Sequence, residues 1–66
     1  LGTVNEKDGE FYSHLHMSAA DAEGIVFGGH LNSATVSATC EMVIELIDGR
    51  VDRKFSDEVG LNLFSF

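Results

Sequence analysis

The feature that most constrains the fold of this chain is a two-residue alternation of apolar and polar side chains, interrupted at Asp-Gly turns. Asp-Gly occurs in KDGE at 7–10 and in IDGR at 47–50, and this pair is a strong hairpin signal when strands flank it. After the first turn, one face of the segment 11–18 carries Phe11, Ser13, Leu15 and Met17, and the other carries Tyr12, His14, His16 and Ser18. A period of two is typical of a β-strand.

A second alternating segment covers 40–47, with Cys40, Met42, Ile44 and Leu46 on one face and Glu41, Val43, Glu45 and Ile47 on the other. A helix over 36–47 is the alternative, but the β-branched residues of this segment favour an extended chain. The segment 25–30, the opening segment 1–5 and the closing segment 61–66 complete a set of about five strands with little helix. We therefore predict a mainly β fold built on a small antiparallel sheet.

The length of the chain, 66 residues, limits the core that it can bury. A domain of this size buries only about 60% of the surface that its unfolded chain exposes, so it generally needs reinforcement. Cys40 is the only cysteine, which excludes an intrachain disulfide and leaves a metal or self-association. No amphipathic helix is available to cover an open sheet, and its edge strands would expose unpaired backbone groups. We therefore expect a homo-oligomer.

The charge balance argues against nucleic acid as a partner of this chain alone. Eleven acidic and four basic residues give a formal net charge of -7, whereas DNA binding draws most of its affinity from Lys and Arg on phosphates. The apolar run 42–44 is far shorter than the ~20 residues that span a bilayer, so we expect no membrane association. The sequence opens without a charged and then apolar leader, and a single cysteine suits a reducing compartment, so we expect a cytoplasmic location.

A family resemblance is carried by residues 9–48, which read GEFYSHLHMSAADAEGIVFGGHLNSATVSATCEMVIELID. Their order of HLH, an acidic-Gly turn, GGHL and a strand with a Thr/Ala-x-Glu element resembles the second half of the plant and prokaryote conserved (PPC) domain. The opening LGTV is similar to the family's Leu-x-Gly strand, and the closing DEVGLNLFSF is similar to its last strand. We interpret the chain as a single, partial PPC-like domain over 1–66.

The resemblance implies an antiparallel α+β unit whose helix and further strands would precede the first residue of this chain. The predicted sheet then corresponds to the second half of that unit and would be completed by oligomerisation, with a trimer implied by the trimers of the family. Plant members carry AT-hooks, Arg-Gly-Arg-Pro elements that enter the DNA minor groove, but this sequence contains none. A DNA-associated regulatory protein is therefore an alternative that depends on fold-level analogy. A purely structural assembly domain is a second alternative.

The three histidines are the strongest candidates for a binding site. Residues two apart on a strand project to the same side, so His14 and His16 share a face, with their Cα atoms about 6.5–7 Å apart. If 16–18 and 25–30 pair about a turn near 22–23, His30 lies beside His16. Three imidazoles with an open fourth position are typical of a catalytic or ligand-accepting zinc site, so we predict that zinc or another divalent transition metal binds here.

Other arrangements of these residues remain open. A bulge at Gly28 and Gly29 would shift the register by one residue and turn His30 to the opposite face. Histidines on a half-exposed strand also commonly form hydrogen bonds to backbone groups or pack at a subunit boundary. If the metal site forms, Glu41, which matches the glutamate position of the family, would accept a hydrogen bond from a ligating histidine and orient its ring.

The remaining candidates are interpreted as structural. Cys40 shares the apolar face of its segment, so we expect a small buried side chain and not a nucleophile. The Gly28–Gly29 pair lacks the lysine of a phosphate-binding loop and is interpreted as a backbone bend, and RVDRK at 50–54 is interpreted as a solvated loop. The chain is thus not clearly an enzyme. The chemistry that its residues permit is the attack of metal-activated water on an electrophile, with Glu41 as proton acceptor.

Overall fold

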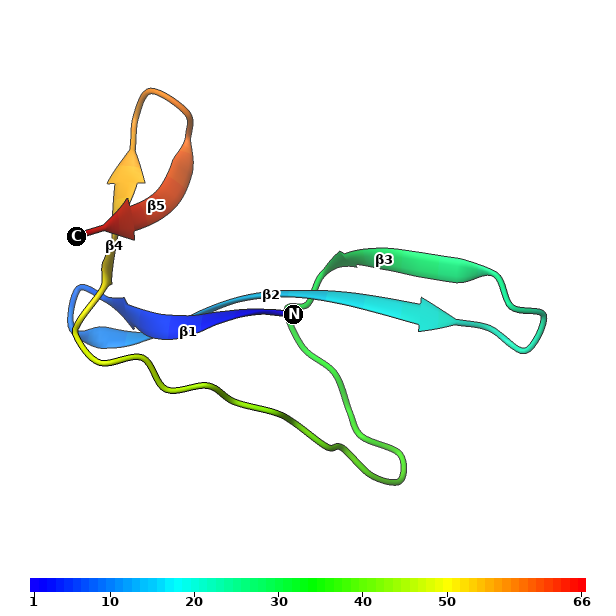
Figure 1. Cartoon of the computed structure of the whole chain (residues 1–66). Helices are drawn as coiled ribbons and strands as arrows, with labels where there is room; N and C mark the ends of the chain where they lie inside the picture. Colours follow the sequence, from blue (N-terminus) through cyan, green and yellow to red (C-terminus); the bar gives the residue numbers. More distant parts are fainter.

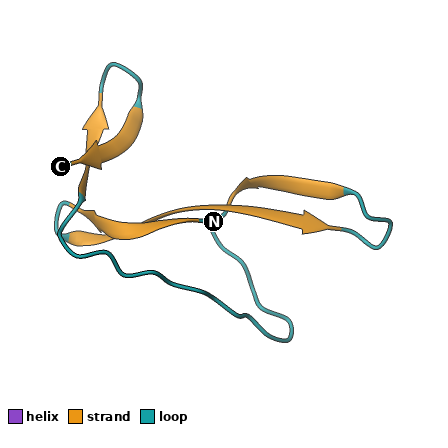
Figure 2. Ribbon diagram, in the orientation of Figure 1, coloured by secondary structure: helices purple, strands orange, loops and turns teal.

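The computed structural model describes all 66 residues and contains five strands and no helix (Figures 1 and 2). The strands are β1 (Gly2–Lys7), β2 (Glu10–Ala20), β3 (Val26–His30), β4 (Asp52–Ser56) and β5 (Leu61–Ser65). β1, β2 and β3 form one antiparallel sheet in that order, and β4 and β5 form a separate antiparallel hairpin. The prediction of a mainly β fold with small antiparallel sheets is confirmed.

The first Asp-Gly pair forms the predicted hairpin between β1 and β2. Asp8 has a φ of 54° and Gly9 a φ of 78°, so both central residues are left-handed, as a two-residue turn of type I′ requires. Glycine adopts this region freely, and aspartate tolerates it better than most residues. The turn sets the register in which Lys7 lies opposite Glu10 and Gly2 lies opposite Leu15.

The loop between β2 and β3 is organised by Asp21. Its Oδ1 accepts hydrogen bonds from the backbone N–H of Glu23 at 2.9 Å and of Ile25 at 3.0 Å, and Gly24 turns the chain with a φ of 84°. The ladder then continues without interruption, with Met17 opposite Gly29 and Ser18 opposite Gly28. The predicted bend at Gly28–Gly29 is wrong, because both glycines pair with β2 as ordinary strand residues.

The segment 31–51 contains no strand, and Figure 1 shows it as a long loop that swings away from the sheet. The predicted strand over 40–47 is therefore wrong in the single chain. Cys40 is exposed, which also contradicts its expected burial, and Gly49 turns the loop with a φ of 110° without joining two strands. An extended segment becomes a strand only when its backbone groups pair with a neighbour, and neither sheet pairs with this segment.

The segment 50–54 was predicted to be a solvated loop, and this prediction is also wrong. Its last three residues lie in β4, which pairs with β5 from Asp52 opposite Ser65 to Ser56 opposite Leu61. The closing strand predicted over 61–66 is confirmed as β5 (Leu61–Ser65). β4 also carries the one buried residue of the chain, Arg53, which is 8% exposed.

The β4–β5 hairpin meets the larger sheet through polar contacts. Asn5 Nδ2 donates to the carbonyl oxygen of Val51 at 2.8 Å, and Asn62 Nδ2 donates to the hydroxyl of Tyr12 at 3.2 Å. Arg50 forms an ion pair with Glu6 on β1. These side chains hold the hairpin at the β1–β2 side of the sheet, where Figure 1 shows β4 rising from it.

The chain has no apolar core, because none of its hydrophobic residues is buried. Large apolar side chains stay accessible on the strands and on the loop, including Phe27 at 64% exposure, Ile44 at 74% and Leu46 at 91%. The radius of gyration is 14.9 Å, against about 11 Å for a compact domain of this length. The structure contains no helix with the length and hydrophobicity that a membrane crossing would require.

Candidate functional site

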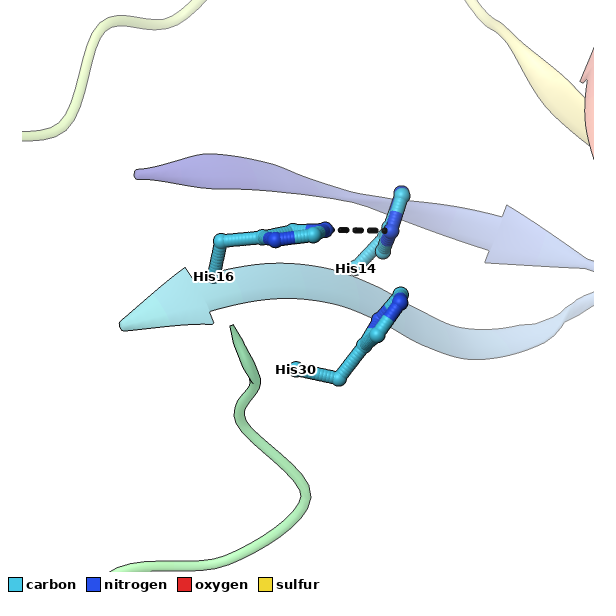
Figure 3. Close-up of side chains that lie close together, drawn as sticks. All are labelled: His14, His16 and His30. Atoms are coloured by element: carbon cyan, nitrogen blue, oxygen red, sulfur yellow. Dashed lines mark hydrogen bonds between the residues drawn. The ribbon is translucent and has the colours of Figure 1, made fainter. Parts of the chain in front are cut away.

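The three histidines converge on one face of the larger sheet (Figure 3). His14 and His16 lie two residues apart on β2 and therefore project to the same side. His30 ends β3 directly opposite His16, which confirms the pairing predicted from the turn near 22–23. The Asp21 loop produces this register, since a shift by one residue would carry His30 to the other face.

The ring nitrogens of the histidines are close enough to share an ion. The potential ligand nitrogens of all three lie within 4.8 Å of one another, and Nε2 of His14 lies 3.2 Å from Nε2 of His16. Two nitrogens bound tetrahedrally to one zinc ion at 2.0–2.1 Å are separated by about 3.3 Å. The His14–His16 pair therefore already has the spacing of zinc ligands, and the exposed His30 offers a third ligand nitrogen within 4.8 Å of them.

The rings also contact one another directly. The centroid of the His30 ring lies 4.3 Å from that of His16 and 5.2 Å from that of His14, with the latter pair stacked. In the Nε2–Nε2 contact of His14 and His16, one nitrogen must carry the hydrogen and the other must accept it. The contact therefore requires that at least one of the two rings is neutral.

The surroundings of His14 favour the neutral imidazole. Partial burial lowers the pKa of His14 below its ordinary value of 6.5, and the neighbouring His16, His30 and Arg53 side chains lower this pKa further. A metal ion binds the neutral imidazole, so a lowered pKa of His14 favours coordination.

The cluster opens onto a hollow of about 440 Å³ between β2 and the β4–β5 hairpin. This volume lies in the range of small-ligand sites. The hollow is lined by Tyr12, Ser13, His14, Leu15, His16, His30, Leu31, Asn32, Arg53, Leu61, Asn62 and Leu63. None of these twelve residues is acidic, although the chain carries eleven acidic residues.

Arg53 lines the hollow and is held in place by both sheets. Its Nη1 donates to the carbonyl oxygen of Asn62 at 2.9 Å, and its Nη2 donates to Oγ1 of Thr3 at 3.0 Å. Its Cζ lies 4.0 Å from the centroid of the Phe64 ring and 5.3 Å from that of Tyr12. The sequence interpretation missed this residue.

A sequence signal for β4 was nevertheless present. Val51, Arg53 and Phe55 alternate with Asp52 and Lys54, as in a strand. That pattern locates the strand, but it does not identify Arg53 as part of a site, because its contacts come from three other strands, with Thr3 on β1, Tyr12 on β2 and Asn62 and Phe64 on β5.

Glu41 is not brought to the histidines. It is exposed in the loop between β3 and β4, it does not line the hollow, and it forms no hydrogen bond with an imidazole. Within this chain no carboxylate therefore orients the three rings. Cys40, the neighbour of Glu41, is also outside the cluster.

Comparison with known proteins identifies one family. The model of the Plants and Prokaryotes Conserved (PCC) domain matches residues 1–48, which include β1, β2, β3 and the three histidines. β4 and β5 lie beyond the matched residues. No curated protein and no solved structure matches the chain. The match covers most of the chain, which therefore belongs to the PCC domain family, the family named PPC above.

Proposed function

We propose that this protein is an oligomeric binding module that holds a divalent transition metal ion, with zinc as the first candidate, at His14, His16 and His30. The observation that carries the proposal is the convergence of three imidazoles from two paired strands, two of them with their Nε2 atoms 3.2 Å apart. Imidazole suits zinc, copper, iron and nickel, and three imidazoles leave an open position for a further ligand.

The position of the cluster supports binding of a ligand better than a packing role. His16 and His30 are exposed and His14 is half-buried. The three rings are therefore not brought together by burial in an apolar core. Their open side faces the hollow between β2 and the β4–β5 hairpin. A metal ion bound by the three histidines would join β2 to β3, and its free coordination position would face that hollow.

The proposed activity is binding and not hydrolysis. Metal-assisted hydrolysis commonly uses a carboxylate that takes a proton from the bound water. The hollow is lined by no acidic residue, and Glu41 lies away from the cluster. The residues around the cluster are therefore better suited to holding a ligand than to activating water.

The test of the metal site uses protein purified without an affinity tag, stripped with a chelator and titrated with Zn²⁺ by calorimetry. We expect one bound ion per chain in the unchanged protein and at least tenfold weaker binding in H14A, H16A and H30A. Ser18→Ala is the matched control, because Ser18 follows His16 by two residues on the same face of β2. Equal Zn²⁺ affinity in all four variants would refute the proposal.

We also propose that the module works as a homo-oligomer, with the trimer implied by the family resemblance as the first candidate. The support is the absence of a buried apolar residue together with a radius of gyration of 14.9 Å. Burial of apolar surface is the dominant favourable contribution to folding, and a second copy is the partner available to provide it. Light scattering coupled to size exclusion measures the state directly, and a folded monomer at micromolar concentration would contradict the proposal.

A further inference from the structure

The one buried residue of this acidic chain is a cation. Arg53 is 8% exposed, whereas every other residue is half-buried or exposed. The chain has eleven acidic residues and a net charge of -7, yet none of its carboxylates forms an ion pair with Arg53. Buried charges in proteins are normally paired, because taking an ion out of water is costly.

The partners of the Arg53 guanidinium are all uncharged. They are the carbonyl oxygen of Asn62, the hydroxyl of Thr3 and the ring faces of Phe64 and Tyr12. Ring faces attract a cation, but they offset only part of the lost hydration. Nε has no hydrogen-bond partner, and Nη1 and Nη2 each keep one N–H beyond the bonds described. The guanidinium is therefore incompletely satisfied within the chain.

Arg53 lines two adjoining hollows. Besides the hollow described above, a second one of about 440 Å³ lies on the β1 side, and both are lined by His14, His16, Leu63 and Arg53. Neither hollow is lined by an aspartate or a glutamate. A metal ion at the histidines would add two positive charges next to a cation that already lacks a counter-ion. An anion between the two positive centres would compensate both.

We propose that the hollow binds a small organic carboxylate, which lies between the Arg53 guanidinium and the open position of the metal. The inference rests on the proposed function in that the metal supplies the second positive centre. The free N–H groups of Nη1 and Nη2 supply charge-assisted hydrogen bonds to the carboxylate. The rings of Tyr12 and Phe64 contact Arg53 and line the two hollows, and they offer apolar surface to the hydrocarbon part of the acid. This combination of one cation and two aromatic rings suits an organic acid better than inorganic phosphate.

The experiment compares butyrate with butyramide, its uncharged isostere, on the zinc-loaded protein by calorimetry. Loss of the charge-assisted bonds should weaken binding of the amide by about 10- to 100-fold, and inorganic phosphate should also bind more weakly than butyrate. Butyramide or phosphate that binds as tightly as butyrate would overturn the inference. This comparison uses the unchanged protein. It therefore tests the inference even if substitution of Arg53 unfolds the hairpin.

Two variants locate the binding. Arg53→Lys keeps the charge but loses the planar fork, and we expect at least tenfold weaker butyrate binding with unchanged Zn²⁺ stoichiometry. Lys54→Met is the matched control, because it removes a cation from the exposed neighbouring position on β4 and should bind butyrate normally. Butyrate affinity that falls equally in both variants would overturn the inference.

The two proposals can fail separately. Zinc binding without butyrate binding would refute the carboxylate site alone. Butyrate binding that depends on Arg53 in a protein that binds no zinc would refute the metal site and leave Arg53 as the anion-binding group.

Discussion

His16 on β2 and His30 on β3 lie directly opposite each other in the antiparallel ladder, and their ring centroids are 4.3 Å apart. Opposite residues of an antiparallel pair project to the same face, so one register places both imidazoles beside His14. The histidine cluster is therefore created by strand pairing, and it depends on the contacts that fix the β2–β3 register.

The first prediction concerns the loop that fixes this register. Asp21→Ala removes the acceptor of the hydrogen bonds from the Glu23 and Ile25 N–H groups. Each lost bond should cost about 1 kcal/mol of stability, and Zn²⁺ affinity should fall several-fold because His30 is held less firmly opposite His16. Calorimetry and urea unfolding measure the two effects. Asp21→Asn keeps an acceptor oxygen and is the control that should preserve Zn²⁺ affinity, and equal affinity in D21A would contradict the prediction.

The second prediction concerns pH and the metal-free protein. The pKa of His14 is lowered in the folded chain, so below pH 6.5 the unfolded chain binds its proton before the folded chain does. The contribution of His14 to stability is therefore complete above about pH 6.5 and is lost as the pH falls toward the lowered pKa. Urea unfolding between pH 8 and pH 5 should show a smaller loss of stability in H14Q than in the unchanged protein. Parallel pH profiles for the two proteins would be the contrary result.

Local signals predicted the strand pairing that brings the three histidines together. The Asp8–Gly9 turn and the loop that begins at Asp21 are determined by residues close in the chain, and they place His14, His16 and His30 by simple counting along the strands. The pairing of His16 with His30 could therefore be predicted, although the sequence did not exclude a bulge at Gly28 and Gly29 that would turn His30 to the other face.

The parts of the fold that depend on distant residues were not predicted. Arg53 is buried because residues from β1, β2 and β5 surround its guanidinium. The local sequence RVDRK does not predict those contacts. The alternation over 40–47 did indicate a segment suited to strand pairing, but the chain provides no partner strand for it. The periodicity of a segment indicates its preference for an extended conformation. It does not identify the neighbouring strand with which that segment would pair.

The third prediction concerns DNA. The chain carries a net charge of -7, and three of its four basic residues are already engaged: Lys7 with Asp8, Arg50 with Glu6, and Arg53 with Thr3 and Asn62. Because duplex affinity comes mainly from cations on phosphates, we expect no retarded complex with duplex DNA at about 0.1 M salt. An electrophoretic mobility shift that weakens steeply as salt rises would contradict this expectation and favour the DNA-associated alternative.

The fourth prediction concerns the segment 40–47 in the assembled protein. Its apolar side chains are exposed in the single chain, including Ile44 at 74%, and an assembly that gives the segment a partner strand would bury them. Ile44→Asp should then weaken association by about 10- to 100-fold, since burying such a side chain contributes about 1.5–3 kcal/mol. Analytical ultracentrifugation over a range of concentrations measures the shift. Glu45→Gln changes the adjacent residue, which an extended segment projects to the other face, and it should leave association unchanged. If I44D assembles as tightly as the unchanged protein, the segment lies outside the interface and the copies meet elsewhere.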